Sequence, residues 1–544
     1  MERAGASERR GLARRAGVVS AAVFSSRILG LVREQVFATC FGAGRELDAF
    51  VTAFRIPNLF RDLFAEGALS AAFVATFTQE EARRGPGAAW RLANLVVNAL
   101  ALIVGLVCLA GIAWAPSVTT AIAPGFDAIP GKTALTIHLT RIMFPFLLLV
   151  ALAAVAMGVL NTRNRFGIPA AASTFFNLGS VVGGLACAWW LAPEYFAALR
   201  GTAPLDPAAS ERAITGMAVG TLIGGLCQLL VQVPSLRRVG YRYRPLLSFR
   251  DPGVRQVLRL MAPATIGAAA VQVNVFVNSN FASYLGDGPV SWLNVAFRFM
   301  QLPIGLFGVA VGTVALPTLA RHVAADDRVA LARTLRQSLE LIGALCIPAA
   351  AGLALYGVPV IGLIYEHGRF GHTDTIAAAH ALTAYAVGLA GYAGIKVLAP
   401  AFYALGDART PMVVSVISIL VNLTLNWTLV HVLGLGHVGL ALSTSAVALG
   451  NFVLLYFFLR RRIGRFDGHL GGTLARIIVA AGLMAAFGAA ADMVLAPRLP
   501  STPVVRYALE LAIEVPLCVG LFVLVARGLG VPLPWGRRPV VAPE

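Results

Sequence analysis

Charged residues are scarce in this sequence. Asp, Glu, Lys and Arg make up 13% of its 544 residues, whereas 58% are hydrophobic. A soluble domain carries about 25% charged residues. The sequence also lacks the ~10-residue segments of alternating apolar and polar residues that build a transmembrane β-barrel. Apolar runs of roughly 20 residues recur instead, long enough to cross the hydrocarbon core of a bilayer. We therefore expect an all-α integral membrane protein.

Catalytic motifs are missing as well. The sequence contains no Walker A loop, no nucleophile elbow and no HExxH pair. Its six cysteines all fall in apolar runs, where cysteine behaves as a small hydrophobic residue. We therefore expect no enzyme activity, no cofactor and no disulfide framework. Without a nucleotide site, transport must draw on a gradient, the membrane potential or the substrate's own free energy.

The apolar runs predict about fourteen transmembrane helices. Basic residues mark cytoplasmic loops. About thirty Lys and Arg fall on one side of the predicted helices and about five on the other. The net charge of +18 therefore indicates orientation rather than nucleic-acid binding, and both termini are predicted to be cytoplasmic. The predicted helices span 17–43, 48–80, 92–116, 134–161, 167–193, 213–236, 254–285, 289–319, 335–358, 376–404, 410–434, 438–459, 474–496 and 504–527. The basic residues expected in outer loops are Lys132, Arg200, Arg212, Arg369 and Arg498.

Three pairs of similar segments indicate an internal repeat. Their offsets are 244, 243 and 242 residues. Parallel repeats of this kind in transporters place the substrate site at their interface near the membrane midplane. We expect two pseudo-symmetric six-helix lobes around a central cavity and an extra C-terminal helix pair. The paired segments are FATCFGAG (37–44) with FASYLGDG (281–288), AFR (53–55) with AFR (296–298), and LNTRNRFGIP (160–169) with FYALGDARTP (402–411). The expected parts are 1–240, 241–465 and 466–544.

Charged residues interrupt several of the apolar runs. A charge near the bilayer centre costs roughly 3 kcal/mol on insertion scales, so such residues usually face a water-filled cavity or a partner. Guanidinium groups suit phosphate because their fork matches two oxygens. We therefore predict a cavity that binds an anionic substrate. The alternatives are pairing with nearby acids and placement at the membrane interface. The candidate substrate-binding residues are Arg27, Arg33, Arg61, Arg298 and Lys396.

Gly30 separates Arg27 from Arg33 and would permit a helix break that turns both side chains toward one cavity. Asp48 and Glu66 are predicted as gate or proton partners, with a structural ion pair as the alternative. Arg55, near the outer end of its helix, is predicted as a lock or interfacial residue.

Polar residues of the second half could supply oxygen ligands to Na⁺. We favour interhelical hydrogen bonds, which asparagine commonly makes in membranes, because a cation site without a carboxylate would be weak. The candidates are Asn278, Asn422, Asn426 and Thr444.

Several blocks of the sequence resemble the MurJ/MviN family, lipid II flippases of the multidrug/oligosaccharidyl-lipid/polysaccharide (MOP) exporter superfamily. The resemblance covers essentially the whole chain, and the block at 54–74 is the most specific. The blocks are SRILGLVRE (26–34), FGAGRELDAF (41–50), FRIPNLFRDLFAEGALSAAFV (54–74), APGF (123–126), RIMFPFLLL (141–149), GVLNTRNRFGIPA (158–170) and KVLAPAFYALGDARTP (396–411).

This resemblance implies an inner-membrane transporter of lipid II, the undecaprenyl-diphosphate-linked peptidoglycan precursor. It implies alternating access from the cytoplasmic to the periplasmic leaflet, driven by membrane potential, with a Na⁺ site in some members. It also implies acidic gate residues at Asp48 and Glu66 and a lipid-tail groove in the extra helix pair. We expect a monomer that works near cell-wall synthesis or division proteins. The essential cavity cations of the family match Arg27, Arg33, Arg61 and Arg298.

Four positions depart from the family pattern. Phe297 and Gln301 stand where acidic residues are usual. Asn278 and Asn426 stand where some relatives carry Na⁺-site carboxylates. These changes leave the arginines intact and weaken the case for cation coupling.

Two alternatives to a lipid II flippase remain. One is an exporter of another lipid-linked oligosaccharide or of a small molecule within the same superfamily. A cationic-drug antiporter would need acids rather than arginines in its cavity, which argues against that form. The other is a non-transporting scaffold, which should have lost its costly buried charges.

Overall fold

The structure is a computed structural model that describes residues 2–64, 68–464 and 469–533. These residues form helices joined by turns and loops, and none of them lies in a β-strand. The contacts divide the chain into two compact units, Met1–Gly288 (unit 1) and Pro289–Glu544 (unit 2).

Unit 1 contains the helices of the first half and one more. They are α1 (Glu2–Phe41), α2 (Arg45–Phe64), α3 (Ala68–Arg84), α4 (Pro86–Ala113), α5 (Ala115–Ile122), the 3₁₀ turn η1 (Pro124–Ala128), α6 (Lys132–Met143), α7 (Phe146–Thr162), α8 (Gly167–Leu191), α9 (Pro193–Leu199), α10 (Pro207–Leu230), α11 (Val233–Arg238) and α12 (Pro252–Ser283).

Unit 2 contains the remaining helices. They are α13 (Pro289–Pro303), the π turn η2 (Ile304–Gly308), α14 (Val309–Ala324), α15 (Arg328–Leu355), α16 (Gly357–Tyr365), α17 (His372–Val387), α18 (Leu389–Ala404), α19 (Arg409–Trp427), the π turn η3 (Thr428–Val432), α20 (Gly436–Ile463), α21 (Leu470–Leu495), the 3₁₀ turn η4 (Ala496–Arg498) and α22 (Pro503–Gly528).

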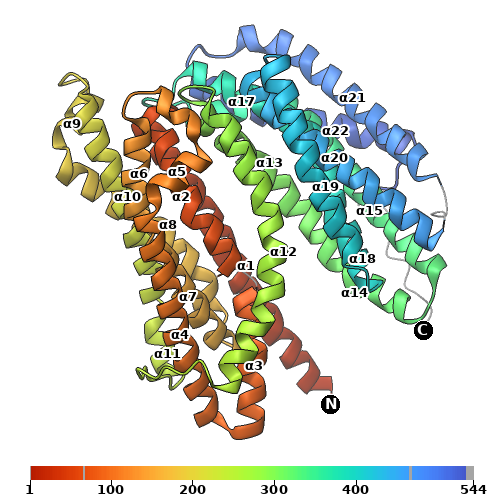
Figure 1. Ribbon diagram of the computed structural model, residues 1–544. Coiled ribbons are helices and arrows are strands. Elements are labelled where there is room, and N and C mark those ends of the chain that lie inside the picture. Colours follow the sequence, from red (N-terminus) through yellow and green to blue (C-terminus); the bar gives the residue numbers. More distant parts are fainter. Residues whose placement is uncertain (1, 65–67, 465–468, 534–544) are drawn as a thin grey trace. The chain divides into compact units, whose positions relative to one another are not determined.

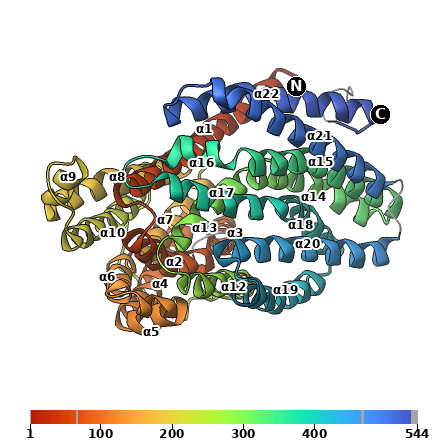
Figure 2. The same cartoon turned by 90° about the horizontal axis from the view of Figure 1, so that it is seen from above.

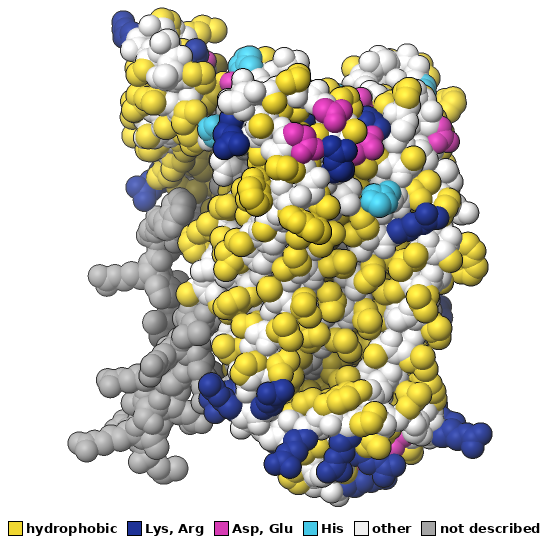
Figure 3. Space-filling model, turned by 90° about the vertical axis from the view of Figure 1, so that its left-hand side faces the viewer, with side chains coloured by type: hydrophobic (Ala, Val, Ile, Leu, Met, Phe, Trp, Pro, Cys, Tyr) yellow, Lys and Arg dark blue, Asp and Glu magenta, His cyan; other side chains and the backbone are white. Residues whose placement is uncertain are grey.

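The membrane class predicted from the sequence is confirmed in outline. Ten helices or continuous helix pairs of the described chain are long and apolar enough to cross a membrane, and α17 with α18 makes an eleventh if they count as one span. On the face drawn in Figure 3, hydrophobic side chains cover the middle and Lys and Arg gather at the lower end. This surface suits a hydrocarbon layer bounded by polar headgroups.

The predicted helix at 376–404 is instead two helices. α17 and α18 meet at Gly388 and are bent by 43°. A Cβ at Gly388 would lie 2.6 Å from the Ser445 Cα of α20, so only glycine allows this close approach. The predicted helix at 289–319 is also interrupted, because the π turn η2 follows Pro303. Proline removes a backbone donor, and local π geometry is a common response.

Glycine brings α8 and α10 together in unit 1. The two helices lie side by side (Figures 1 and 2). A Cβ at Gly216 would lie 2.3 Å from the Ala188 backbone nitrogen, and one at Gly220 would lie 2.3 Å from the Gly184 Cα. Small residues at such spacing let membrane helices pack backbone to backbone. This pair forms a closely packed wall of unit 1.

A second stabilising feature of unit 1 is the segment that joins α11 to α12. Asn94 and Asn98 of α4 donate to the backbone carbonyls of Arg242 and Arg244 at 3.1 and 2.9 Å. The Tyr241 hydroxyl donates to the Asn94 Oδ1 at 3.0 Å. Burial of this hydroxyl raises the pKa of Tyr241 to about 12. The two asparagines therefore hold an otherwise irregular segment along one helix.

The repeated segments fall at corresponding helix ends. The first pair includes the ends of α1 and α12, and the third pair includes the junctions of α7 with α8 and of α18 with α19. The turns of each pair therefore occupy equivalent positions in the order of the helices. By its contacts α12 belongs to the first compact unit, and the expected two-lobe arrangement stays a prediction.

Candidate functional site

A buried ion cluster lies at the end of unit 1 where α1 gives way to α2. Asp48, in the first turn of α2, and Lys132, the first residue of α6, have fully buried side chains. The Lys132 Nζ is 3.0 Å from the Asp48 Oδ2 and 2.7 Å from the Asp287 Oδ1. It also donates to the Gly286 carbonyl at 3.2 Å. An ammonium has three donors, and all three are used here.

The cluster fixes the residues that lead out of α12. The Gly288 N–H donates to the Asp48 Oδ2 at 2.7 Å. The Lys132 Nζ lies 4.2 Å from the centre of the Phe126 ring, a favourable cation–π distance. Residues 286–288 are thus bonded to both members of the buried pair. Loss of one partner from such a pair leaves an uncompensated charge and costs about 3–5 kcal/mol.

Other polar contacts tie α2 to its neighbours. The Arg45 Nη2 is 2.5 Å from the Glu211 Oε1 of α10. The Arg55 Nη1 donates to the Ser279 Oγ of α12 at 2.5 Å. Asp48 and Arg55 are seven residues apart, which is two helical turns along one face. α2 therefore bonds α6, α10 and α12 through charged side chains.

The two arginines of α1 have different surroundings. α1 is continuous through Gly30, so the expected helix break is wrong, because one glycine costs only about 1 kcal/mol in a helix. Arg27 is exposed, whereas the Arg33 side chain is 12% exposed. The Arg33 guanidinium lies over the rings of Phe54 and Phe176, 5.7 and 5.1 Å from their centres. Arg33 is therefore held between α2 and α8.

The remaining candidate cations are distributed over both units. Arg61 is half-buried near the end of α2 in unit 1. In unit 2, Arg298 of α13 is half-buried, and Lys396 of α18 is exposed. Glu66, predicted as a gate residue, lies outside the described residues.

The asparagines proposed for Na⁺ make hydrogen bonds within unit 2. The Asn422 Nδ2 donates to the Ser443 Oγ of α20 at 3.2 Å, and the Asn426 Nδ2 donates to the Asn422 Oδ1 at 3.2 Å. Thr444 donates to the Leu440 carbonyl of its own helix, and Asn278 lies on α12 of unit 1. The described residues contain no group of three or more His, Cys, Asp or Glu placed to hold a metal ion. Of these bonds, the one between Asn422 and Ser443 joins two helices, as expected from the sequence, and the other two lie within a single helix.

Unit 2 has an apolar groove of about 420 Å³. α15 and α22 form most of it, and α21 contributes Met484. Its lining includes Ala344, Pro348, Tyr356, Met484, Cys518 and Phe522. Such a groove suits an apolar chain rather than a charged group.

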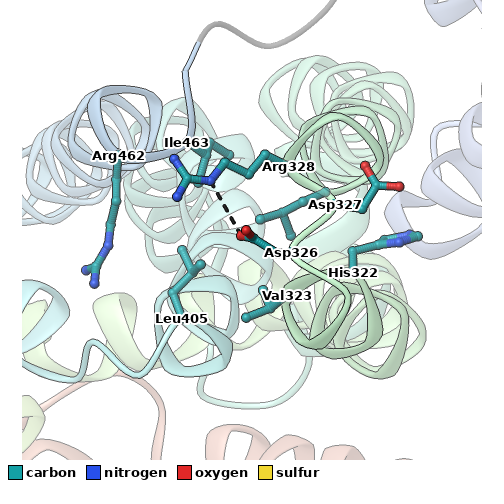
Figure 4. Close-up of a pocket in the computed structure, with 9 residues that line it drawn as sticks. His322, Val323, Asp326, Asp327, Arg328, Leu405, Arg462 and Ile463 are labelled. Carbon is teal, nitrogen blue, oxygen red and sulfur yellow. Dashed lines mark ion pairs between the residues drawn. The ribbon is translucent and has the colours of Figure 1, made fainter.

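A smaller cavity of about 210 Å³ lies at the junction of α14 and α15 (Figure 4). Its acidic residues have partners. Asp326 is 3.7 Å from Arg328, and Asp327 accepts the Ala330 N–H at 2.8 Å. Arg462 pairs with Asp407. Asp327 therefore caps α15, as aspartate commonly does, and the two acids do not form a metal site.

Two functional candidates escaped the sequence reasoning. Lys132 was expected in an outer loop but is buried in the ion cluster. Glu514 is a buried acid in the middle of α22. An acidic residue inside an apolar run was the available signal for Glu514, whereas nothing local distinguished Lys132 from a loop lysine.

The fold and these charges define a class of protein. The chain has ten or more apolar spans and buried ions at helix ends, which is typical of a polytopic membrane transporter. A solved structure described as "Lipid II flippase MurJ, inward closed conformation" covers 94% of this chain and 99% of its own, with a TM-score of 0.73 at 24% identity. An inward-facing multidrug resistance MATE family transporter of the MOP superfamily covers 82% and 98%, with a TM-score of 0.64 at 14% identity. The fold is that of MOP transporters.

Sequence comparison narrows this class to one family. The family profile described as "Lipid II flippase MurJ" matches residues 37–499. The lipid II flippase MurJ of Burkholderia cenocepacia is 37% identical over 450 residues, 82% of this chain and 83% of the relative. A probable lipid II flippase MurJ of Rhizobium meliloti is 35% identical over 527 residues, 95% and 94%. The chain belongs to the lipid II flippase MurJ family.

Proposed function

We propose that this protein is a transporter that moves lipid II from the cytoplasmic to the periplasmic leaflet of the bacterial inner membrane. The observation that carries the proposal is the family match over residues 37–499. Transport proceeds by alternating access and breaks no covalent bond, so the protein is not an enzyme. The membrane potential drives it, and Na⁺ is not required, since the asparagines that could replace Na⁺ ligands bond each other and Ser443.

The diphosphate of the substrate binds to positive side chains. Arg33 supports this role because two aromatic rings stabilise its charge at 5.1 and 5.7 Å. The Glu34 carboxylate lies 3.8 Å from the Arg33 Nη2, so a diphosphate bound there competes with Glu34 for the guanidinium. Arg61 and Arg298 are half-buried, and Arg27 and Lys396 are exposed. The five binding residues are Arg27, Arg33, Arg61, Arg298 and Lys396.

The ion cluster of unit 1 acts as the periplasmic gate. Asp48 holds Gly288, and Lys132 holds Gly286 and Asp287. These residues cannot separate from α2 and α6 while the buried pair is intact, so opening at this end must break these bonds. Arg55 reinforces the gate through Ser279. Glu66 is assigned to the gate by the resemblance alone.

The isoprenoid tail of lipid II lies in the apolar groove between α15 and α22, to which α21 contributes Met484. The groove is lined mainly by carbon atoms of aliphatic and aromatic side chains. Burial of an isoprenoid chain there is favourable by about 0.8 kcal/mol per CH₂ relative to water. The hydrocarbon core of the bilayer offers the chain a similar apolar environment. The extra helix pair therefore serves to bind the isoprenoid tail.

The complete topology has fourteen spans and cytoplasmic termini. Eleven spans follow from length and hydropathy, counting α17 with α18. The charged helices α1, α2 with α3, and α12 supply the other three. Lys and Arg lie at both ends of the face in Figure 3, but at the lower end they have few acidic neighbours, which supports a cytoplasmic placement of that end. The lobes comprise 1–240 and 241–465, the extra pair 466–544, and the protein acts as a monomer near cell-wall synthesis or division proteins.

Complementation of a flippase-depleted bacterium tests this function. Arg27→Ala and Arg298→Ala should each abolish growth while membrane levels of the protein stay normal. Arg238→Ala is the matched control, because Arg238 is exposed at the end of α11. Normal growth with both Arg27→Ala and Arg298→Ala would refute the proposed diphosphate site. Failure of the unsubstituted protein to complement would favour another lipid-linked oligosaccharide as the substrate.

A further inference from the structure

Glu514 of α22 is a buried acid in an unusual position. It is 1% exposed, and no described residue makes a well-formed hydrogen bond to its carboxyl oxygens, although the Tyr356 hydroxyl is close enough to donate weakly to the carboxylate. It lies eleven residues after Pro503, which is about 17 Å along the helix axis and hence close to the middle of the span. The other buried carboxyl groups among the described residues have polar partners: Arg45 for Glu46, Lys132 for Asp48, Thr473 for Glu340 and Arg506 for Glu510.

Among the residues that the structure describes, no cation neighbours the Glu514 carboxyl. Its polar neighbours are Asp492 of α21, Glu510 one turn earlier on α22, and the Tyr356 hydroxyl between α15 and α16. That hydroxyl is 3.3 Å from the Cys518 Sγ. α16 carries only the phenol of Tyr365 as a titratable group. The nearest arginine on the same helix, Arg506, is already 2.6 Å from Glu510.

A small cation must therefore accompany the Glu514 carboxylate. An ionised carboxylate without a cationic partner in a low-dielectric site costs several kcal/mol. The described residues offer no cluster of three or more His, Cys, Asp or Glu for a metal ion, whereas a proton needs no ligand other than one carboxylate oxygen, so a proton is the cation that suits this site. An ionisable residue inside a membrane span is a functional candidate by default.

Glu514 is adjacent to the apolar groove. Val515 and Cys518, which follow it on α22, line the groove together with Tyr356. An apolar occupant would exclude water from this wall and make an ionised carboxylate beside it still more costly. Occupancy of the groove and protonation of the carboxyl should therefore favour each other.

We propose that Glu514 is a proton-binding site coupled to occupancy of the apolar groove by an isoprenoid chain. The inference rests on the proposed function only in taking the groove as the place of the lipid tail. When the chain enters, a proton from water adds to one carboxylate oxygen and gives the neutral acid. When the chain leaves, the proton returns to water. No bond forms between protein and lipid. By linkage, an uptake of one proton changes the affinity for the chain as much as tenfold per pH unit.

Calorimetry with an uncharged isoprenoid probe tests the coupling. Farnesol is titrated into the purified full-length protein in two buffers with different ionisation enthalpies, and the difference in heat gives the number of protons taken up. The titration is repeated over a range of pH. At a pH where Glu514 is ionised before farnesol is added, the unsubstituted protein should take up close to one proton per farnesol bound. Glu514→Gln should bind farnesol without proton uptake at any pH. Glu340→Gln is the matched control, because Glu340 is also buried but is bonded to Thr473, and it should behave like the unsubstituted protein.

Several outcomes would overturn the proposal. Binding of farnesol to the unsubstituted protein without proton exchange across the whole pH range would do so, as would undiminished proton uptake by Glu514→Gln. The first measurement needs no variant, so it remains decisive if Glu514→Gln does not fold. Absence of farnesol binding would overturn both this coupling and the use of the groove by the tail. Growth of the Arg27→Ala strain bears on the diphosphate site alone, so the two failures are distinguishable.

Discussion

The buried pair of Lys132 and Asp48 gives the sharpest prediction about the gate. Lys132→Met keeps the length of the side chain and removes its charge. The Asp48 carboxylate then keeps the Gly288 N–H at 2.7 Å but loses its cation at 3.0 Å. Because both side chains are fully buried, the substitution should lower the free energy of unfolding by about 3–5 kcal/mol. Asp48→Asn should have a smaller effect, since the amide can still accept from Gly288.

A double-mutant cycle isolates the interaction energy between Asp48 and Lys132 from their contacts with other residues. Asp48→Asn combined with Lys132→Met removes both charges, so its cost should fall short of the sum of the single costs by at least about 2 kcal/mol. Denaturant unfolding of the purified protein measures all four free energies. Additive costs, or a loss below about 1 kcal/mol for Lys132→Met, would refute the reasoning, because the pair would then be solvated or already broken.

Loosening the gate should also change its exposure. Thr136 is one turn below Lys132 on α6 and is fully buried. In a cysteine-free background, Thr136→Cys should react with a membrane-impermeant maleimide added from the periplasmic side much faster when Lys132→Met is present. An unchanged reaction rate in a destabilised protein would mean that the pair supports the fold without acting as a gate.

Two further predictions concern the stability of unit 1. Gly220→Leu should prevent accumulation of folded protein, because its Cβ alone would lie 2.3 Å from the Gly184 Cα. The control Gly105→Leu should accumulate normally, because the space around Gly105 is open. Equal yields of the two variants on size-exclusion chromatography would contradict the close packing of α8 and α10. Burial raises the pKa of Tyr241 to about 12, above its usual value of about 10. The folded state therefore holds the phenol proton more tightly than the unfolded state, and stability should fall as pH rises from 10 to 12. Tyr241→Phe should lose less over this range in thermal unfolding, and an equal loss would assign the alkaline transition to other groups.

The sequence predicted the membrane class well because hydropathy is a local property. A helix in lipid must satisfy its backbone bonds internally, so each long apolar run becomes a helix whatever its neighbours are. The junctions also followed, since the FGAG and FASYLGDG segments both end a helix at a glycine-containing turn. The same rule explains the error at Gly30. A glycine in a membrane helix has no competing hydrogen-bond partners in lipid, so α1 continues through it.

The site was less predictable because its contacts join distant segments. Lys132 meets residues 84 positions before it and 155 positions after it, and no local pattern encodes that meeting. A lysine between two apolar runs reads as a loop residue unless its partners are known. Arg33 was recognised as unusual from its position, but the rings of Phe54 and Phe176 that hold it come from two other helices.

The three kinds of buried charge point to three different uses. Lys132 has all its donors occupied by fixed protein groups, so it can hold a closed state but cannot bind a substrate without releasing those groups. Arg33 lies beside two ring faces and has the Glu34 carboxylate at 3.8 Å, so an anion that binds it must compete with Glu34 for the guanidinium. Glu514 has only the Tyr356 hydroxyl and acidic groups as polar neighbours and no cation among the described residues, so its charge depends on what enters the adjacent groove. A transporter that must grip a diphosphate, release it and accommodate an isoprenoid chain needs all three, because each responds to a different change in its surroundings.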